Sequence, residues 1–402
     1  MAFKNAYIPY GQYWSTPFSR WQSNFQNLHA MKFAADITSR FLNNNNISPN
    51  EFDELLLGIT IPQLNSFYGG PWLASMIGAE HVTGPVISQA CATGTNSVSI
   101  AAQHIETGLN KNVLVVCADK CSNGPHLAYP NPQAPGNTLD SENWVWDNFS
   151  YDPYAKNSML ETAENVAKEA GITRKEQDKL TLLRYNQYQD SLKDDRAFQK
   201  RYMFEPIEVK DRSGRKILAV VEGDEGIFPT TMEGLSKLRP VIPEGTVTYG
   251  TQTHPADGNC GIIVSTKEKA EKLRNRDDVE IRIVSYGDYK TKKGYMAMAV
   301  VPAAKNALKN ADISIADVSV IKTHNPFAVN DVYFCNEMDV DWKAMNNYGC
   351  SLIFGHPQAP TMLRIIIELI EELVMKGGGY GLADGCAAGD TGAALILKVN
   401  IG

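Results

Sequence analysis

The sequence lacks long apolar runs, and neither sign of charge dominates it. No run of apolar residues approaches the ~18 that a membrane-spanning helix needs, and the N-terminus carries no extended apolar region typical of a secretory signal. The 38 Lys and Arg residues are interspersed among 45 Asp and Glu residues, which gives a net charge of −7 at pH 7. This balance offers no basic field for nucleic acid or an anionic membrane. We expect a cytoplasmic protein that acts on small molecules or other proteins.

The cysteines form neither a disulfide framework nor a zinc motif. Their number is odd and they are scattered, at positions 91, 117, 121, 260, 335, 350 and 386. Cys117 and Cys121 have neither a CxxC spacing nor a second pair nearby, so the sequence predicts no metal site. Any reactive role of a cysteine must therefore come from its local setting.

The 402 residues are too many for one ordinary core, and strand and helix patterns alternate at both ends of the chain. Near the N-terminus we predict a helix over 28–45 and strands over 52–60 and 113–118. Near the C-terminus a helix follows position 356, and strands cover 380–383 and 393–399. These matching strand–helix units indicate a duplicated α/β fold.

The middle of the chain has a different character. Prolines and glycine between 125 and 136 break regular structure, and helices are predicted over 159–170 and 174–193. Between the two parts lies a group of aromatic residues, which forms either a small satellite core or one wall of a binding site; it comprises Trp144, Trp146, Phe149, Tyr151 and Tyr154.

Three residues with reactive side chains lie in glycine-rich junctions. Cys91 follows an apolar run and precedes a helical pattern, and a helix start lowers the pKa of a thiol and offers N–H groups to an oxyanion. His356 in Gly-His-Pro and Cys386 in Gly-Cys-Ala-Ala-Gly are interpreted as similar strand–helix junctions. Alone, each cysteine would more often be a buried apolar residue and each histidine a structural one. The three together favour a catalytic set.

Six motifs, in order, resemble those of the thiolases along nearly the whole chain. The nucleophile motif is similar to that of sterol-carrier-type and archaeal thiolases. The six segments are Ala90–Gly94, Met159–Ala167, Leu235–Pro240 followed by Gly245–Thr248, His324–Ala328, Gly355–Pro357 and Cys386–Gly392.

The resemblance implies a thiolase fold, with two similar α/β halves in five α-β-α-β-α layers. We expect an N-terminal core over 1–270, with a loop domain over 125–245 inserted in it, and a C-terminal core over 271–402.

The resemblance also implies a role for each reactive residue. Cys91 would carry the acyl group as a thioester, with His356 as the neighbouring base. Cys386 would protonate the departing enolate and then deprotonate CoA. His324 and His356 would bind the enolate oxygen, and the backbone N–H groups of Cys91 and Ala388 would form a second oxyanion hole. CoA would be a cosubstrate, with no tightly bound cofactor.

Departures from the family pattern point to a different acyl group. Ala388 and Asp390 occupy positions where glycines are common, which would place a charge near the second oxyanion hole. The altered pocket favours a bulky or aromatic 3-oxoacyl-CoA, such as benzoylsuccinyl-CoA, against a wall of Trp144, Trp146 and Phe149. For CoA the candidate contacts are Arg184, Arg215 and Thr253.

Two other functions stay open at this point. One is a condensing enzyme similar to HMG-CoA synthase or the ketoacyl synthases, against which Cys386 argues. The other is a thiolase-fold subunit without catalysis, for which Ala388 and Asp390 argue. The resemblance further implies a homodimer or a dimer of dimers, and it allows a small zinc-ribbon/OB-fold accessory subunit.

Overall fold

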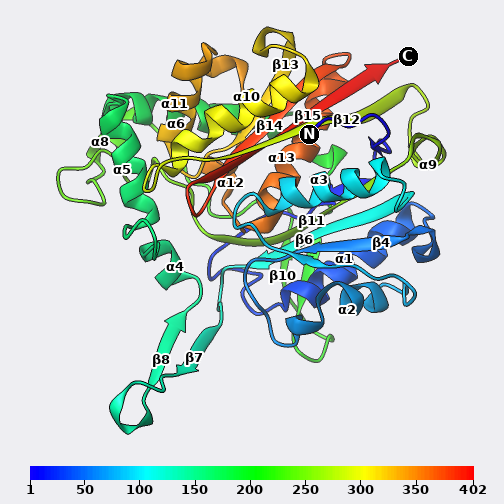
Figure 1. Ribbon diagram of the computed structural model, residues 1–402, viewed down its shortest axis with the longest axis horizontal. Coiled ribbons are helices and arrows are strands. Elements are labelled where there is room, and N and C mark those ends of the chain that lie inside the picture. Colours follow the sequence, from blue (N-terminus) through cyan, green and yellow to red (C-terminus); the bar gives the residue numbers. More distant parts are fainter.

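The computed structural model describes all 402 residues, and its core contains two sheets, one in each half of the molecule, that are joined through a short strand (Figure 1). The N-terminal sheet has the order β11-β6-β4-β5, with short strands β2 and β3 added against β11. The strand bounds are β2 (Tyr13–Ser15), β3 (Ser19–Arg20), β4 (Glu54–Gly58), β5 (Val86–Ile87), β6 (Asn112–Lys120) and β11 (Ala256–Ser265). Every residue of β6 is buried, as the continuous apolar run around 113–118 predicted.

The C-terminal sheet has the order β13-β14-β15-β12, and β1 lies between β12 and β11, so the strands join into one continuous path. Its strands are β12 (Val279–Lys290), β13 (Val318–His324), β14 (Gly379–Ala387) and β15 (Thr391–Ile401), with β1 at Tyr7–Ile8. Strand β14 is longer than the predicted 380–383 and contains Cys386. The predicted strand–helix junction at Cys386 is therefore wrong, because no helix follows this residue. It lies at the end of a strand that turns back as the antiparallel β15.

Helices form three layers around the two sheets (Figure 1). Helices α1 (Ala30–Asn44) and α2 (Gly69–Met76) cover the outer face of the N-terminal sheet. Helix α10 (Val300–Ala311) covers the outer face of the C-terminal sheet, and α11 (Ala328–Met338) packs beside α10. Between the sheets lie α3 (Thr93–Glu106) and α13 (Ala359–Met375). The predicted five-layered thiolase fold is confirmed.

The two central helices approach each other closely at their N-termini. All residues of α13 except its last are buried, as a helix enclosed by two sheets requires. A Cβ at Gly94 in α3 would lie 2.6 Å from the backbone nitrogen of Leu363 in α13, so only glycine fits there. This contact brings the residues that precede both helices to one place.

The inserted segment has two parts. Helices α4 (Trp146–Ser150), α5 (Met159–Glu169), α6 (Arg174–Ser191) and α8 (Met232–Lys237) lie beside the C-terminal half, and the hairpin of β7 (His126–Pro130) and β8 (Leu139–Asn143) extends away as an exposed arm (Figure 1). The hairpin of β9 (Ile207–Lys210) and β10 (Ile217–Val221) packs into the core of the N-terminal half. Three short helices complete the chain, α7 (Lys193–Arg196), α9 (Lys267–Leu273) and α12 (Ser351–Phe354).

The predicted helices over 159–170 and 174–193 are present as α5 and α6. Each begins with a reciprocal capping box, Ser158 with Glu161 and Thr173 with Glu176. None of the helices combines the length and apolar character that crossing a bilayer demands.

Candidate active site

Cys91 lies between β5 and α3, one residue before the helix cap. Its neighbour Ala90 has a φ of 44°, so the chain turns sharply just before the thiol. The side chain is 8% exposed, and its Sγ lies 3.1 Å from Nε2 of His356 and 3.4 Å from Oε1 of Gln358. A thiol and an imidazole in direct contact can exchange a proton without any further movement of the chain.

His356 is held by the first turn of α13. Its Nδ1 lies 2.6 Å from Oγ1 of Thr361, which leaves Nε2 facing Cys91. Gln358 follows with a φ of 65° and a ψ of −107°, a conformation that non-glycine residues adopt only under constraint. The constraint comes from Asp119 in β6, whose carboxylate accepts the N–H of Ala359 at 2.9 Å. The α13 start is thus fastened to the N-terminal sheet.

His324 ends β13 and is completely buried. Its Nδ1 lies 2.8 Å from Oγ of Ser351, and its ring centroid is 4.2 Å from that of His356. The remaining nitrogen, Nε2, has no hydrogen-bond partner in the protein. A buried polar atom without a partner is costly, so this Nε2 is available to a ligand atom.

Cys386 approaches the same place from the end of β14. Its thiol is completely buried and accepts a hydrogen bond from Nδ2 of Asn330 in α11, at 3.1 Å. Its charge would interact with that of Cys91, so the two sulfurs are electrostatic neighbours. The structure therefore brings all four reactive residues that the sequence analysis named into one buried corner, which we call the catalytic corner (Cys91, His324, His356 and Cys386).

Burial makes the resting catalytic corner neutral. Desolvation raises the pKa of Cys91 to about 12, although the backbone N–H groups of Ala388 and Cys91 itself oppose the shift. Desolvation lowers the pKa of His356 to about 3. At neutral pH the thiol keeps its proton and Nε2 of His356 keeps its lone pair. The two N–H groups that act on Sγ belong to the residues predicted to form the second oxyanion hole.

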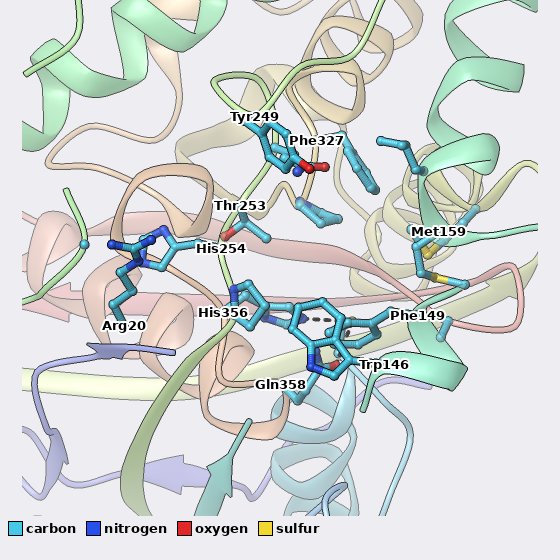
Figure 2. Close-up of a pocket in the computed structure, with 18 of the residues that line it drawn as sticks. Arg20, Trp146, Phe149, Met159, Tyr249, Thr253, His254, Phe327, His356 and Gln358 are labelled. Carbon is cyan, nitrogen blue, oxygen red and sulfur yellow. Dashed lines mark hydrogen bonds between the residues drawn. The ribbon is translucent and has the colours of Figure 1, made fainter. Parts of the chain in front are cut away.

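Two members of the catalytic corner, Cys91 and His356, line a cavity of about 660 Å³, which is large enough for a substantial organic group. Apolar side chains from α4, α5 and several loops line the rest of it, and Trp146 and Phe149 lie in front of His356 and Gln358 (Figure 2). The other apolar residues on its surface are Met159, Leu160, Phe228, Tyr249, Pro255, Met296, Pro326, Phe327 and Ala388.

One predicted member of this wall is elsewhere. Trp144 does not line the cavity, because its indole N–H donates to the carbonyl of Thr60 at 2.8 Å and its ring packs in a small cluster with Ile61 and Cys121. Of the five aromatic residues of this group, Trp146 and Phe149 line the cavity, Trp144 packs in the small cluster, and Tyr151 and Tyr154 are exposed.

Of the three predicted CoA contacts, only Thr253 lines the cavity. Its hydroxyl donates to the carbonyl of Ser351. Arg184 is wrong as a phosphate contact, because it is fully buried and pairs with Asp331 at 2.8 Å. Arg215 is exposed, but it lies in the β9–β10 hairpin and does not line the cavity.

Asp390 does not place a charge at the second oxyanion hole. Its carboxylate turns to the loop after β12, where it accepts the N–H groups of Gly294 at 2.8 Å and Tyr295 at 3.1 Å. Ala388, in contrast, lines the cavity beside Cys91. The replacement of glycine at 390 therefore fastens a loop and leaves the donor at 388 in place.

The catalytic corner also contains a set of potential metal ligands. One atom each of Cys91, His324 and His356 lies within 4.8 Å of the others, a mixed sulfur and nitrogen set that suits a borderline-soft cation. The sequence analysis considered only Cys117 and Cys121 and did not see this set, because its members are far apart in the chain.

Four further residues of the site escaped the sequence analysis: Arg20, Asp119, Asn330 and Gln358. Asp119 directly follows an apolar strand run, and Asn330 lies in a helix with no special spacing. Gln358 directly follows the Gly-His-Pro motif in the sequence. This adjacency to His356 is the one sequence signal that could have predicted its place in the site.

Comparisons with known proteins agree with this geometry. Residues 13–268 match the family model of the thiolase N-terminal domain, and residues 278–399 match that of the thiolase C-terminal domain. The chain belongs to the thiolase family. This thiolase is 28% identical to an acetyl-CoA acetyltransferase of Paracoccus denitrificans over 391 residues, which cover 95% of this chain and 97% of the relative. It is also 28% identical to the human mitochondrial 3-ketoacyl-CoA thiolase over 392 residues, 95% of this chain and 96% of the relative.

Solved structures give the same result. The acetyl-CoA acetyltransferase of Bacillus anthracis superposes with a TM-score of 0.89 at 26% identity, over 99% of both chains. The human mitochondrial 3-ketoacyl-CoA thiolase in complex with CoA superposes with a TM-score of 0.88 at 26% identity, again over 99% of both chains. The protein is accordingly a thiolase-type acyltransferase.

Proposed function

We propose that this thiolase transfers an acyl group between a 3-oxoacyl-CoA and CoA through an acyl-Cys91 intermediate. The observation that carries the proposal is the 3.1 Å contact between Sγ of Cys91 and Nε2 of His356, at the convergence of two central helices. Cys91 and His356 are both neutral at rest, so Cys91 does not have to be ionised before the substrate binds. Proton transfer to His356 accompanies the attack of sulfur on the ketone carbon.

The C2–C3 bond of the substrate then breaks, and its electron pair becomes an acyl-CoA enolate. His356, now protonated, and His324 would donate Nε2–H to the enolate oxygen. His324 carries this proton only if Nδ1 accepts from Ser351, whose hydroxyl lies at 2.8 Å. The unpartnered Nε2 of His324 supports this role, since the enolate would supply the partner that the protein withholds.

Cys386 is the proposed acid in the first half-reaction and the base in the second. Its proton passes to the α-carbon of the enolate, and the resulting thiolate takes the proton of incoming CoA. The CoA thiolate attacks the acyl thioester, the C–S bond to Cys91 breaks, and Cys91 regains the proton held by His356. The N–H of Asn330 stabilises the intervening Cys386 thiolate through its contact at 3.1 Å.

The apolar wall supports a bulky or aromatic acyl group, with benzoylsuccinyl-CoA as the proposed example. Trp146 and Phe149 meet edge to face with ring centroids 6.1 Å apart, and both border the cavity next to His356. An aromatic acyl group could extend this edge-to-face packing, which small acyl groups would leave unused.

We further propose that the protein is a homodimer or a dimer of dimers. A small zinc-ribbon/OB-fold accessory subunit is compatible with this proposal. Edge strand β5 ends the N-terminal sheet, and Val86 in β5 is exposed. Beside it, after β4, the side chains of Leu64, Phe67 and Tyr68 are 80%, 93% and 68% exposed. An apolar patch at a free sheet edge is typical of a surface that another subunit covers.

A substrate panel tests the function. The purified protein is mixed with CoA and a series of 3-oxoacyl-CoAs that runs from acetoacetyl-CoA to aryl-substituted members, and the acyl-CoA products are measured by mass spectrometry. We expect two acyl-CoA products per turnover and the highest kcat/KM for aryl members. Highest activity on acetoacetyl-CoA would overturn the substrate class. Decarboxylation products in place of two acyl-CoAs would overturn the thiolase reaction.

A further inference from the structure

The cavity contains one permanently charged side chain, and that charge has no partner. Among the residues that line it, Arg20 is the only Arg, Lys, Asp or Glu. Its guanidinium makes no ion pair and no hydrogen bond within the protein, and it lies over the ring of Phe228, with the centroid 5.5 Å away. Arg20 is exposed, so its unpaired guanidinium borders the mostly apolar cavity and is open to an anion supplied by a ligand.

The fold places Arg20 close to the catalytic corner. Strand β3 pairs with β11 so that Arg20 lies opposite Ala256, and the N–H of Ala256 donates to the carbonyl of His356 at 3.3 Å. Since neighbouring strands lie about 5 Å apart, the backbone of Arg20 is about 10 Å from that of His356. Figure 2 shows the Arg20 side chain beside the ring of His254, at the edge of the cavity.

Two neighbours that also line the cavity, Gly226 and His254, restrict the side chain of Arg20. Gly226 passes so closely that a Cβ there would lie 2.8 Å from Nε2 of His254 and 2.9 Å from Cβ of Arg20. Nε2 of His254 lies 3.2 Å from the carbonyl of Glu225, to which it can donate, and burial together with the charge of Arg20 lowers the pKa of the ring. His254 is thus a neutral neighbour that does not compete with Arg20 for an anion.

The two acids of the neighbouring loop have other hydrogen-bond partners. The carboxylate of Glu225 accepts hydrogen bonds from Ser19 and Asn24, and that of Asp224 pairs with the buried Arg364. Neither carboxylate forms an ion pair with Arg20.

We propose that Arg20 binds a carboxylate carried by the acyl group, so that the substrate is a 3-oxoacyl-CoA with both an apolar and an acidic part. This inference rests on the proposed thiolase reaction. The planar guanidinium matches a carboxylate through two parallel hydrogen bonds.

The position of Arg20 favours the acyl group over CoA as the source of the anion. The phosphates of CoA are separated from the reacting thioester by the whole pantetheine arm, whereas Arg20 lies two strand spacings from His356. A carboxylate on the acyl chain reaches that distance within a few carbon atoms. Trp146 and Phe149 would contact the remaining, apolar part of the acyl group.

The test compares a carboxylated 3-oxoacyl-CoA with its methyl ester, which differs only in charge. Thiolysis of both is measured with wild type, with Arg20→Gln and with the control Arg40→Gln, which removes another exposed guanidinium that lies over a phenyl ring but outside the cavity. We expect Arg20→Gln to lower kcat/KM for the carboxylated substrate about 10- to 100-fold and to leave the ester unchanged. Arg20→Lys should retain part of the activity, and Arg40→Gln all of it.

A second arm varies the CoA. If Arg20 instead binds a CoA phosphate, Arg20→Gln raises the KM for CoA equally with both acyl groups, and the rise is smaller with dephospho-CoA; this result overturns the proposal. Equal loss on acid and ester without any change in the KM for CoA overturns it as well. Failure of the thiolase reaction itself is distinct, because wild type would then cleave neither substrate.

Discussion

The catalytic corner and the apolar wall of the cavity are built on opposite principles. In the corner each reactive side chain is less than a tenth exposed and comes from a strand end or a helix start. In the wall, Trp146 is 40% exposed and Phe228 is 62% exposed, and both come from the inserted segment. We therefore propose that rigid elements fix the chemistry and that the more exposed wall selects the acyl group. Substitutions in the corner should slow every substrate alike, and substitutions in the wall should change only the preference.

The largest effect is expected from Cys386→Ala. The variant lacks the acid for the enolate and the base for CoA, so kcat should fall about 10²- to 10⁴-fold for every acyl group. Cys260→Ala is the control, since Cys260 is an equally buried thiol in β11 that does not belong to the catalytic corner. Steady-state thiolysis measures both, and near-normal turnover by Cys386→Ala would remove Cys386 from the mechanism.

His324→Ala should follow with a loss of about 10²- to 10³-fold in kcat, because one donor to the enolate oxygen disappears. The KM should change little, since the donor acts mainly on the charge that develops during the reaction. His324→Asn restores an N–H donor and should recover much of the loss. Equal loss in His324→Asn and His324→Ala would indicate a structural role instead.

Trp146→Ala tests the wall. We expect kcat/KM for an aryl 3-oxoacyl-CoA to fall about tenfold through lost apolar contact, with acetoacetyl-CoA unaffected. Tyr151→Ala is the matched control, because Tyr151 belongs to the same segment but does not line the cavity. An equal loss of kcat/KM for both substrates would contradict the proposal that the wall affects only the choice of acyl group.

The smallest effect on activity is expected from Asp119→Asn. This variant changes the hydrogen bond between Asp119 and the N–H of Ala359, at the start of α13. Desolvation raises the pKa of Asp119 to about 7, against about 3.9 in an unfolded chain. The folded state therefore binds the extra proton between these values, so the stabilisation that Asp119 gives is complete below about pH 4 and is lost as pH rises through about 7. The melting temperature of wild type should fall relative to that of Asp119→Asn between about pH 4 and pH 7, because only the wild type titrates there. A pH-independent difference would contradict the raised pKa.

The sequence could predict the corner because its residues belong to local motifs. Cys91 and His356 each precede a helix, and that much can be read from apolar periodicity and glycines. Cys386 was found by resemblance, although its setting was wrong: a short apolar pattern does not reveal where a strand stops and turns back.

The sequence could not predict the surroundings of the corner, because these depend on which faces meet in space. Arg184 has the pattern of a surface cation on α6, yet that face packs against α11 and pairs with Asp331. Trp144 and Trp146 are two residues apart and serve different purposes. Arg20 lies in a two-residue strand far from Cys91 in the chain, and only the pairing of β3 with β11 brings it near.

The most direct test of the account is the intact mass of the protein after brief incubation with 3-oxoacyl-CoAs, for wild type and Cys91→Ser. The account predicts a mass increase equal to one acyl group on wild type, which CoA removes, and no CoA-labile adduct on Cys91→Ser. Turnover of a 3-oxoacyl-CoA to two acyl-CoAs without any acyl adduct on Cys91 would contradict it.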